Sequence, residues 1–210
     1  MRTRTWFASI FWFCNVAPYF AIFTFAPLVF STLHISDERI ATISANGLAA
    51  LGAIIGMLVI DRAGRRPTLI VCFWVATITL AVIGAWSGAP GLVVVLCFAL
   101  FSFFDAIGGM LEGVYPAEIF PSHLRAQGTG FAAAFSRIGA ASGTFLLPIG
   151  IAHLGLGPTM LIFAAVSAIG LVVTYMWAPE TANINLTKTC SLEPVSPPPA
   201  PAAGAVAASS

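Results

Sequence analysis

Three ionisable side chains lie inside otherwise apolar stretches and are the first candidates for chemistry. Asp105 and Glu112 share one stretch, and Arg137 lies in the next. A charge at the centre of a bilayer costs about 3 kcal/mol on insertion scales, so it normally faces a cavity or a partner. We expect Asp105 to take up a proton or contact a solute, and Arg137 to supply positive charge for an anionic solute.

Asp105 and Arg137 are predicted to lie at similar depths in two consecutive antiparallel helices. Each is about nine residues from the same end of its stretch, which is about 13 Å at the helical rise. We therefore predict that they pair or share one polar cavity. Glu112 follows Asp105 by seven residues and lies on nearly the same helix face, closer to the surface. The alternative for Glu112 and Arg137 is static packing or a side chain that reaches back to the interface.

Other polar groups lie nearer the start of the chain. Asn15 and Tyr19 are one helical turn apart and could hydrogen-bond a solute. Pro18 and Pro27 permit a bend or break in the same stretch, and broken helices line the substrate sites of many transporters. Asn46, in the second apolar stretch, is a further candidate for the pathway.

Charged motifs stand between the apolar stretches. The sequence from Asp61 to Arg66 reads D-R-A-G-R-R, in which Gly64 permits a tight reversal. Pro116 and Pro121 flank Glu118 and are expected to break the helix there. Because arginine can hold a carboxylate with two parallel hydrogen bonds, we expect an ionic latch between helix ends. Its predicted members are Asp61, Arg62, Arg65, Arg66, Glu118, Arg125 and Glu180; the alternative is simple anchoring at the membrane surface.

The elements that must position these groups are membrane-spanning helices. Residues 138–179 contain no Asp, Glu, Lys or Arg, and neither do residues 67–104. The composition is 59% hydrophobic and 8% charged, whereas soluble domains carry about 25% charged residues. About 20 apolar residues cross a bilayer as a helix. The sequence predicts an all-α integral membrane protein with six spans, at about 6–31, 40–60, 67–87, 91–114, 128–151 and 156–178.

The basic residues predict the orientation of these spans. Seven Lys or Arg residues fall on one side and one, Arg39, on the other. The positive-inside rule then places both termini in the cytoplasm, and we expect a bacterial inner (cell) membrane. Residues 1–5 are expected to be the remnant of a cytoplasmic linker, residues 6–182 the membrane domain, and residues 183–210 a disordered cytoplasmic tail.

Other function classes have little support in the sequence. A net charge of +1 gives no reason to expect nucleic acid as a partner. The histidines and cysteines are too scattered for a metal site, so neither a metal nor a cofactor is expected. A membrane enzyme would need clustered catalytic groups, and no metal-binding or nucleophile motif is present. The expected partners are membrane lipid and a small-molecule solute.

Glycines recur at four-residue spacing in three of the spans. The pairs are Gly52/Gly56, Gly109/Gly113 and Gly139/Gly143. Such spacing lets helix backbones approach closely. We expect most of these glycines to pack helices together, and the alternative is that they let helices slide past one another.

Three motifs, taken together, resemble the C-terminal six-helix half of the major facilitator superfamily. They are the D-R-A-G-R-R turn, the Y-P-A-E-I-F-P segment with Arg125, and the Pro179-Glu180-Thr181 ending, which is similar to that of sugar porters. Phe135-Ser-Arg137-Ile-Gly139 is instead similar to the pattern of organic-anion, aromatic-acid and organic-cation members, which favours a general metabolite transporter. The resemblance implies six transmembrane helices arranged as 3+3 inverted repeats, which is half of a major facilitator fold. It also implies proton-coupled or facilitated transport of a sugar, organic acid or other metabolite, and a latch that holds the outward-open state.

A complete carrier of this superfamily has two six-helix halves, with the substrate site between them. The expected missing partner is therefore an N-terminal six-helix half or a second half-size subunit. The alternative function is that of a transport-inactive, truncated remnant or a membrane interaction protein.

Overall fold

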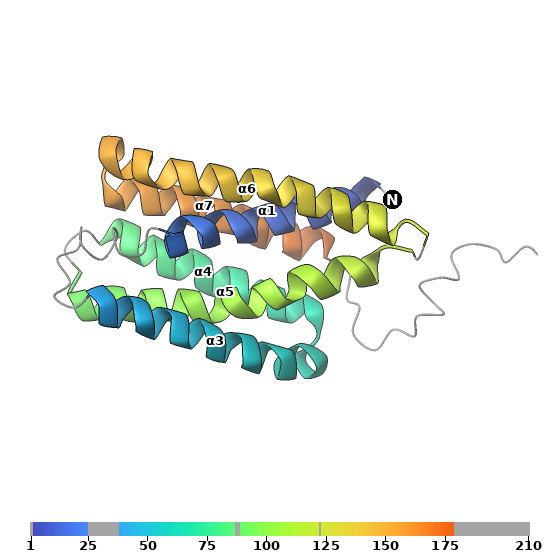
Figure 1. Cartoon of the computed structure of the whole chain (residues 1–210), viewed down its shortest axis with the longest axis horizontal. Helices are drawn as coiled ribbons and strands as arrows, with labels where there is room; N and C mark the ends of the chain where they lie inside the picture. The colour runs from blue at the N-terminus through green and yellow to red at the C-terminus, as the bar shows by residue number, and fades with distance from the viewer. Residues whose placement is uncertain (1, 25–37, 87–88, 122, 179–210) are drawn as a thin grey trace, which may run out of the picture.

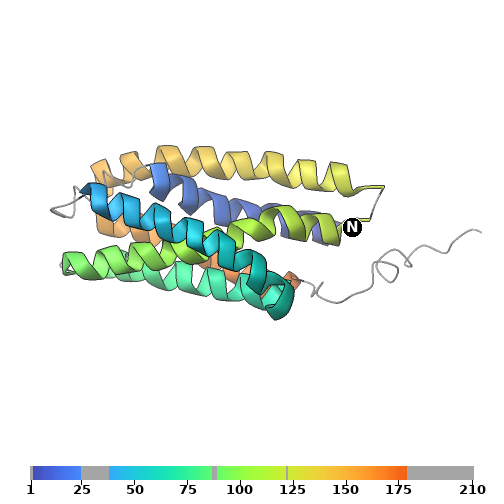
Figure 2. The ribbon, with the colours of Figure 1, turned by 60° about the horizontal axis from the view of Figure 1, so that its bottom comes forward.

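The computed structural model describes residues 2–24, 38–86, 89–121 and 123–178 of the chain. These residues form six helices: α1 Arg2–Thr24, α3 Glu38–Ala63, α4 Arg65–Ala85, α5 Gly91–Ile119, α6 Arg125–Leu154 and α7 Leu156–Trp177. The helices run along one common long axis, as Figures 1 and 2 show from two sides. No strand occurs in this part of the chain.

The apolar stretches predicted these helices well. Five of the described helices, α1 and α4 to α7, are long and apolar enough to cross a membrane. The sixth, α3, is 26 residues long, but its apolar part is shorter and covers Asn46–Ile60. The all-helical membrane architecture is therefore confirmed, whereas the sixth crossing and the 3+3 inverted repeat stay predictions.

One prediction about proline differs from the structure. Pro116 was expected to break its helix, but α5 continues to Ile119. Proline removes only the N–H that would donate to the carbonyl oxygen of Glu112, and the last turn is still closed by the N–H of Phe120, which donates to the carbonyl oxygen of Pro116 at 3.3 Å. Pro18, which was expected to permit a bend or break, lies within α1, and the helix continues through it to Thr24. Pro27 and the remainder of the first predicted span lie outside the described residues, as do Glu180 and the predicted disordered tail.

The outer surface of the bundle is apolar. Leu92 is 72% exposed, Phe145 is 70% exposed and Ile43 is 71% exposed. A water-soluble protein rarely exposes apolar patches this extensive, because water does not solvate them. Lipid chains solvate such a surface, and the helices satisfy their own backbone hydrogen bonds within it.

Two glycines reverse the chain where helices meet. Gly64 has a φ of 91° and is the only residue between α3 and α4. Gly155 has a φ of 84° and connects α6 to α7. A residue with a Cβ rarely adopts this backbone conformation. The prediction that Gly64 permits the tight reversal is confirmed.

Helices pack in pairs along the bundle. The most extensive contacts join α1 to α6, α3 to α5, and α4 to α7. Glycine makes these contacts close: a Cβ on Gly143 would collide with the carbonyl oxygen of Ala17, and one on Gly52 with that of Phe103. Because lipid is as apolar as the side chains, such close packing replaces the hydrophobic effect in holding membrane helices together.

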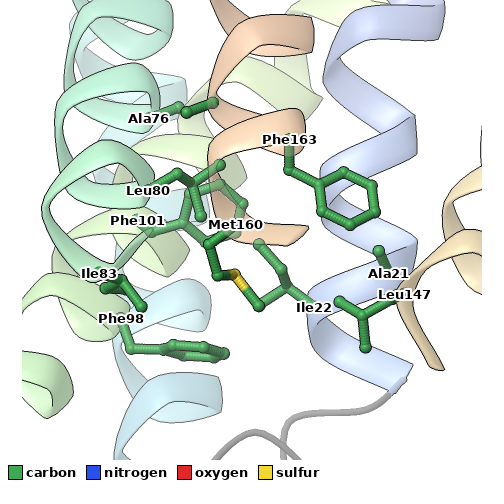
Figure 3. Close-up of a cluster of buried hydrophobic side chains, with 11 residues drawn as sticks. Ala21, Ile22, Ala76, Leu80, Ile83, Phe98, Phe101, Leu147, Met160 and Phe163 are labelled. Atoms are coloured by element: carbon green, nitrogen blue, oxygen red, sulfur yellow. The ribbon is translucent and has the colours of Figure 1, made fainter. Parts of the chain in front are cut away.

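Large apolar side chains fill the space between the helices. One cluster, drawn in Figure 3, gathers residues from α1, α4, α5, α6 and α7 around Leu80 and Met160. A second cluster is aromatic: the rings of Phe7, Phe11 and Tyr115 lie 5.6–6.3 Å apart, and Phe73 contacts Phe11 edge-on. Among the side chains that the structure describes, α3 contributes only Ile60 to these clusters, so this helix lies at the side of the bundle.

We call one end of the bundle the arginine end. It comprises the start of α1 with Arg4, the α3–α4 turn with Arg62, Arg65 and Arg66, the start of α6 with Arg125, and the end of α7. Figure 1 shows these segments together on the right. These five basic residues thus share one end, as the predicted topology requires, while the side of the membrane on which that end lies stays a prediction.

Candidate functional site

A cavity of about 360 Å³ lies between α1, α3 and α5. Small-molecule sites in proteins usually start at about 300 Å³ and combine an apolar wall with a few polar groups. The wall follows this pattern. Its lining residues are Asn15, Val16, Tyr19, Phe20, Ala49, Ala53, Asp105, Ala106, Gly109, Met110 and Glu112.

Asp105 is the most deeply buried charged group of the cavity wall. It is 4% exposed. No described residue donates a hydrogen bond to its carboxylate or forms an ion pair with it. Desolvating a carboxylate without a partner is costly, so the side chain must find a proton, water or a ligand within the cavity.

Glu112 lies two turns further along α5 and is held by α1. Its Oε1 atom accepts a hydrogen bond of 2.9 Å from Nδ2 of Asn15, and Trp12 is a second donor. Asn15 is itself only 6% exposed. It packs against Gly108, where a Cβ would lie 3.1 Å from Oδ1 of Asn15. The glycine therefore lets α1 approach α5 closely enough for this hydrogen bond.

Aromatic side chains of α1 form another part of the wall, and Tyr19 adds a hydroxyl group to it. Tyr19 is 36% exposed, and its ring lies 5.4 Å from Phe20 and 4.6 Å from Phe23. Both Tyr19 and Phe20 line the cavity. The Tyr19 hydroxyl is a donor and an acceptor, and the aromatic rings offer electron-rich faces.

The structure brings together four of the six residues predicted for the pathway: Asn15, Tyr19, Asp105 and Glu112. Arg137 is exposed on α6 and is not among the lining residues. The predicted pairing of Asp105 with Arg137 is absent; the charge of Arg137 acts on Glu112 instead. Asn46 is exposed on α3 and also lies outside the cavity wall.

Part of the cavity wall has no signal in the sequence. Ala49, Ala53 and Ala106 carry no polar signal, and Trp12 was not considered as a donor to Glu112. Gly109 and Gly113 were grouped with packing glycines, but nothing lies within 4 Å of a Cβ built at either position. In α5 these glycines therefore leave open space, in contrast to Gly52 and Gly143.

An ionic contact joins helices at the arginine end. Nη2 of Arg65 lies 3.1 Å from Oε1 of Glu118, and Nη1 donates to the carbonyl oxygen of Ile60 at 3.3 Å. Arg65 thereby ties the start of α4 to the ends of both α3 and α5. Arg66 donates to the carbonyl oxygen of Tyr175 at the end of α7, at 2.9 Å.

The other predicted latch residues are placed differently. Arg62 is exposed, and the structure gives it no partner among the described residues. Arg125 is half-buried, and its Nε atom makes no hydrogen bond within that part of the chain. The side chain of Asp61 and the whole of Glu180 lie outside the described residues. Arg4, which was not predicted, donates to the carbonyl oxygen of Ile119 at 3.0 Å.

Replacing Arg65 with Gln should destabilise the bundle. The change removes a charge-assisted hydrogen bond to Glu118 and one to Ile60, and we expect a loss of about 2 kcal/mol in the free energy of unfolding. Thermal unfolding in detergent micelles would measure it. Arg62→Gln, in the same turn and without those contacts, is the matched control. Equal unfolding temperatures for the two variants would show that the Arg65 contacts do not stabilise the bundle.

A metal centre has no basis in the described residues. No group of three His, Cys, Asp or Glu residues is close enough there to hold a metal ion. The candidate site is therefore the cavity with its two carboxylates, supported by the ionic contacts of the arginine end.

The family model described as sugar (and other) transporter matches residues 1–191. The chain belongs to this transporter family. A similar relative is the inner membrane metabolite transport protein YgcS of Escherichia coli strain K12, 38% identical over 183 residues, which are 87% of this chain and 41% of the relative. Another is the putative metabolite transport protein YaaU of the same organism, 36% identical over 89% of this chain and 43% of the relative.

The sugar-transporter family relatives are transporters and not enzymes. The solved structures of XylE support the same fold. A double Trp mutant of XylE matches 91% of this chain and 43% of its own, with a TM-score of 0.81 and 19% identity. The major facilitator superfamily proton:xylose symporter XylE, bound to 6-bromo-6-deoxy-D-glucose, matches with a TM-score of 0.79, 20% identity and coverage of 90% and 42%. This chain thus spans about two fifths of the length of these relatives.

Proposed function

We propose that the chain forms one six-helix half of a carrier that moves a small organic solute across a membrane by alternating access. The observation that carries the proposal is the cavity between α1, α3 and α5, whose wall combines Asp105, Glu112, Asn15 and Tyr19 inside an apolar bundle. Ionisable groups at such positions mark solute or proton pathways. The metabolite-transport names of YgcS and YaaU support the same class of activity.

We assign a separate role in transport to each polar residue of the cavity wall. Asp105 exchanges a proton or contacts the solute, because it is buried and has no partner in the described residues. Asn15 orients Glu112 through its 2.9 Å hydrogen bond, and Tyr19 hydrogen-bonds the solute. The proton coupling proposed here is supported by the carboxylates themselves, which are the groups that can carry a proton inside a bilayer.

The arginine end is proposed as the cytoplasmic gate. The Arg65–Glu118 contact and the Arg66 contact with α7 hold three helix ends together. Opening the cavity toward the cytoplasm would break them, so they favour the outward-open state. Asp61, Arg62, Arg125 and Glu180 remain proposed members of this gate, and the predicted cytoplasmic side of both termini belongs to the same proposal.

A second six-helix unit would complete the pathway. The relatives are more than twice as long as the matched region, and a carrier of this superfamily binds its substrate between two halves. We propose that this chain corresponds to the C-terminal half. Its partner is an N-terminal half or a second half-size subunit, in a bacterial inner membrane.

Reconstitution into liposomes tests the proposal. The chain, alone and together with the N-terminal half of a relative such as YgcS, would be assayed for uptake of radiolabelled sugars, polyols, organic acids and amines. Uptake that rises when the outside is made acidic would support proton-coupled transport. Absence of uptake of every solute in both preparations would contradict the proposal and favour a transport-inactive membrane protein.

Filling the cavity at Gly109 should impair solute uptake without unfolding the protein. Nothing lies within 4 Å of a Cβ at this position, so Gly109→Val places its methyl groups in the open cavity. We expect binding about tenfold weaker, since overpacking a site costs about 1–3 kcal/mol. Gly130→Val is the control, because Gly130 also has open space but does not line this cavity. Equal uptake by the two variants would contradict the assignment.

A further inference from the structure

The charged side chains of the cavity wall all have the same sign. Asp105 and Glu112 line the cavity, and no Lys, Arg or His is among the lining residues that the structure describes. Two carboxylates on one helix face, about 10 Å apart along the axis, repel each other when both are ionised. A positive charge in the cavity would relieve that repulsion.

Within the described residues, the structure supplies no such charge to Asp105. This side chain is 4% exposed and has no donor and no cation beside it. Glu112, by contrast, is already held by the neutral donors Asn15 and Trp12, and the charge of Arg137 acts on it from an exposed position on α6. Asp105 is therefore the group to which a ligand must supply a positive charge or a hydrogen-bond donor.

The remaining wall fits the apolar surface of an organic cation. Tyr19 and Phe20 present aromatic rings, and Met110 and the alanines of α3 add apolar surface. Aromatic faces attract ammonium groups by about 1–2 kcal/mol when the contact is partly desolvated. A volume of about 360 Å³ accommodates a small molecule.

We infer that this cavity takes a small organic cation, such as a protonated amine or a quaternary ammonium compound, with its positive group at Asp105 beside the Tyr19 ring. The inference rests on the proposed function and narrows its solute class. It differs from the expectation of an anionic solute, because Arg137, which was to bind the anion, is not part of the cavity wall.

Choline and 3,3-dimethylbutan-1-ol test the inference, because they have the same shape and differ only in the charged nitrogen. Binding of each to the full chain in lipid nanodiscs would be measured by equilibrium dialysis, with sorbitol and benzoate as neutral and anionic comparisons. We expect choline to bind at least about tenfold more tightly than its neutral isostere.

Three variants test whether the preference for choline depends on Asp105. Asp105→Asn should abolish the preference for choline, and Glu112→Gln should reduce it. Thr79→Val should keep it, since the hydroxyl of Thr79 bonds only to its own helix at Val75 and Ala76. Loss of the preference in Thr79→Val as well would overturn the assignment to Asp105.

The outcomes separate this inference from the proposed function. Equal affinity for choline and its isostere, or binding of sorbitol or benzoate but not of choline, would overturn the cation inference even if liposome uptake succeeds. Choline binding that depends on Asp105, with no uptake of any solute, would support the inference and contradict the transport proposal.

Discussion

Gly143→Val should prevent α1 and α6 from packing. A Cβ at Gly143 would collide with the carbonyl oxygen of Ala17, and that atom belongs to the backbone of α1 and cannot turn aside. The two helices would have to separate along the most extensive helix contact of the bundle. We expect a loss of at least about 3 kcal/mol, which is a large part of the stability of a typical domain.

Size-exclusion chromatography and thermal unfolding in detergent would measure this effect. Gly130→Val is the matched control, because it makes the same change in the same helix where nothing lies within 4 Å of the new Cβ. We expect the control to remain monodisperse and to unfold at nearly the temperature of the unmodified chain. A Gly143→Val protein as stable as this control would show that α1 and α6 do not pack closely in the membrane.

The helices were predictable because they depend on a local property. An uninterrupted apolar stretch of sufficient length has one favourable state in lipid, and its ends are marked by charges and by residues such as Gly64. The predicted boundaries of α4 and α7 differ from the structure by two residues or fewer at each end. The effect of Pro116 was less predictable, because α5 loses one helical hydrogen bond there and still continues to Ile119.

The candidate site was only partly predictable, because helix neighbours are not set by chain order. Asp105 and Glu112 could be identified as buried charges within an apolar stretch. Their partners could not: α6 packs mainly on α1 rather than on α5, so Arg137 lies away from Asp105. The hydrogen bond between Asn15 and Glu112 joins residues 97 positions apart, and no local pattern marks it.

The glycine pairs also show that sequence spacing does not reveal which neighbour a residue faces. Gly52/Gly56, Gly139/Gly143 and Gly109/Gly113 have identical spacing in the sequence. The first two pairs lie against a neighbouring backbone, and the third faces open space. The pattern indicates a smooth helix face, but only the arrangement of the helices decides whether that face packs or borders a cavity.

Asp105→Asn should remove the proton-driven part of solute uptake. The substitution keeps the size of the side chain but replaces a group that can gain and lose a proton with one that cannot. Because Asp105 is buried and has no partner among the described residues, no neighbouring described carboxylate is placed to replace it at the same depth. We expect uptake driven by an inward proton gradient to fall to the level of protein-free liposomes.

Ser102→Ala in the same helix is the control for this variant. The hydroxyl of Ser102 is buried and donates to the carbonyl oxygen of Phe98 within α5, away from the cavity wall. Both variants should fold, because Asn fills the space of Asp and the Ser102 hydrogen bond is local. Uptake by Asp105→Asn that keeps the rate and gradient dependence of Ser102→Ala would remove Asp105 from the transport cycle. Glu112 would then be the remaining carboxylate of the cavity wall through which a proton could be coupled to the solute.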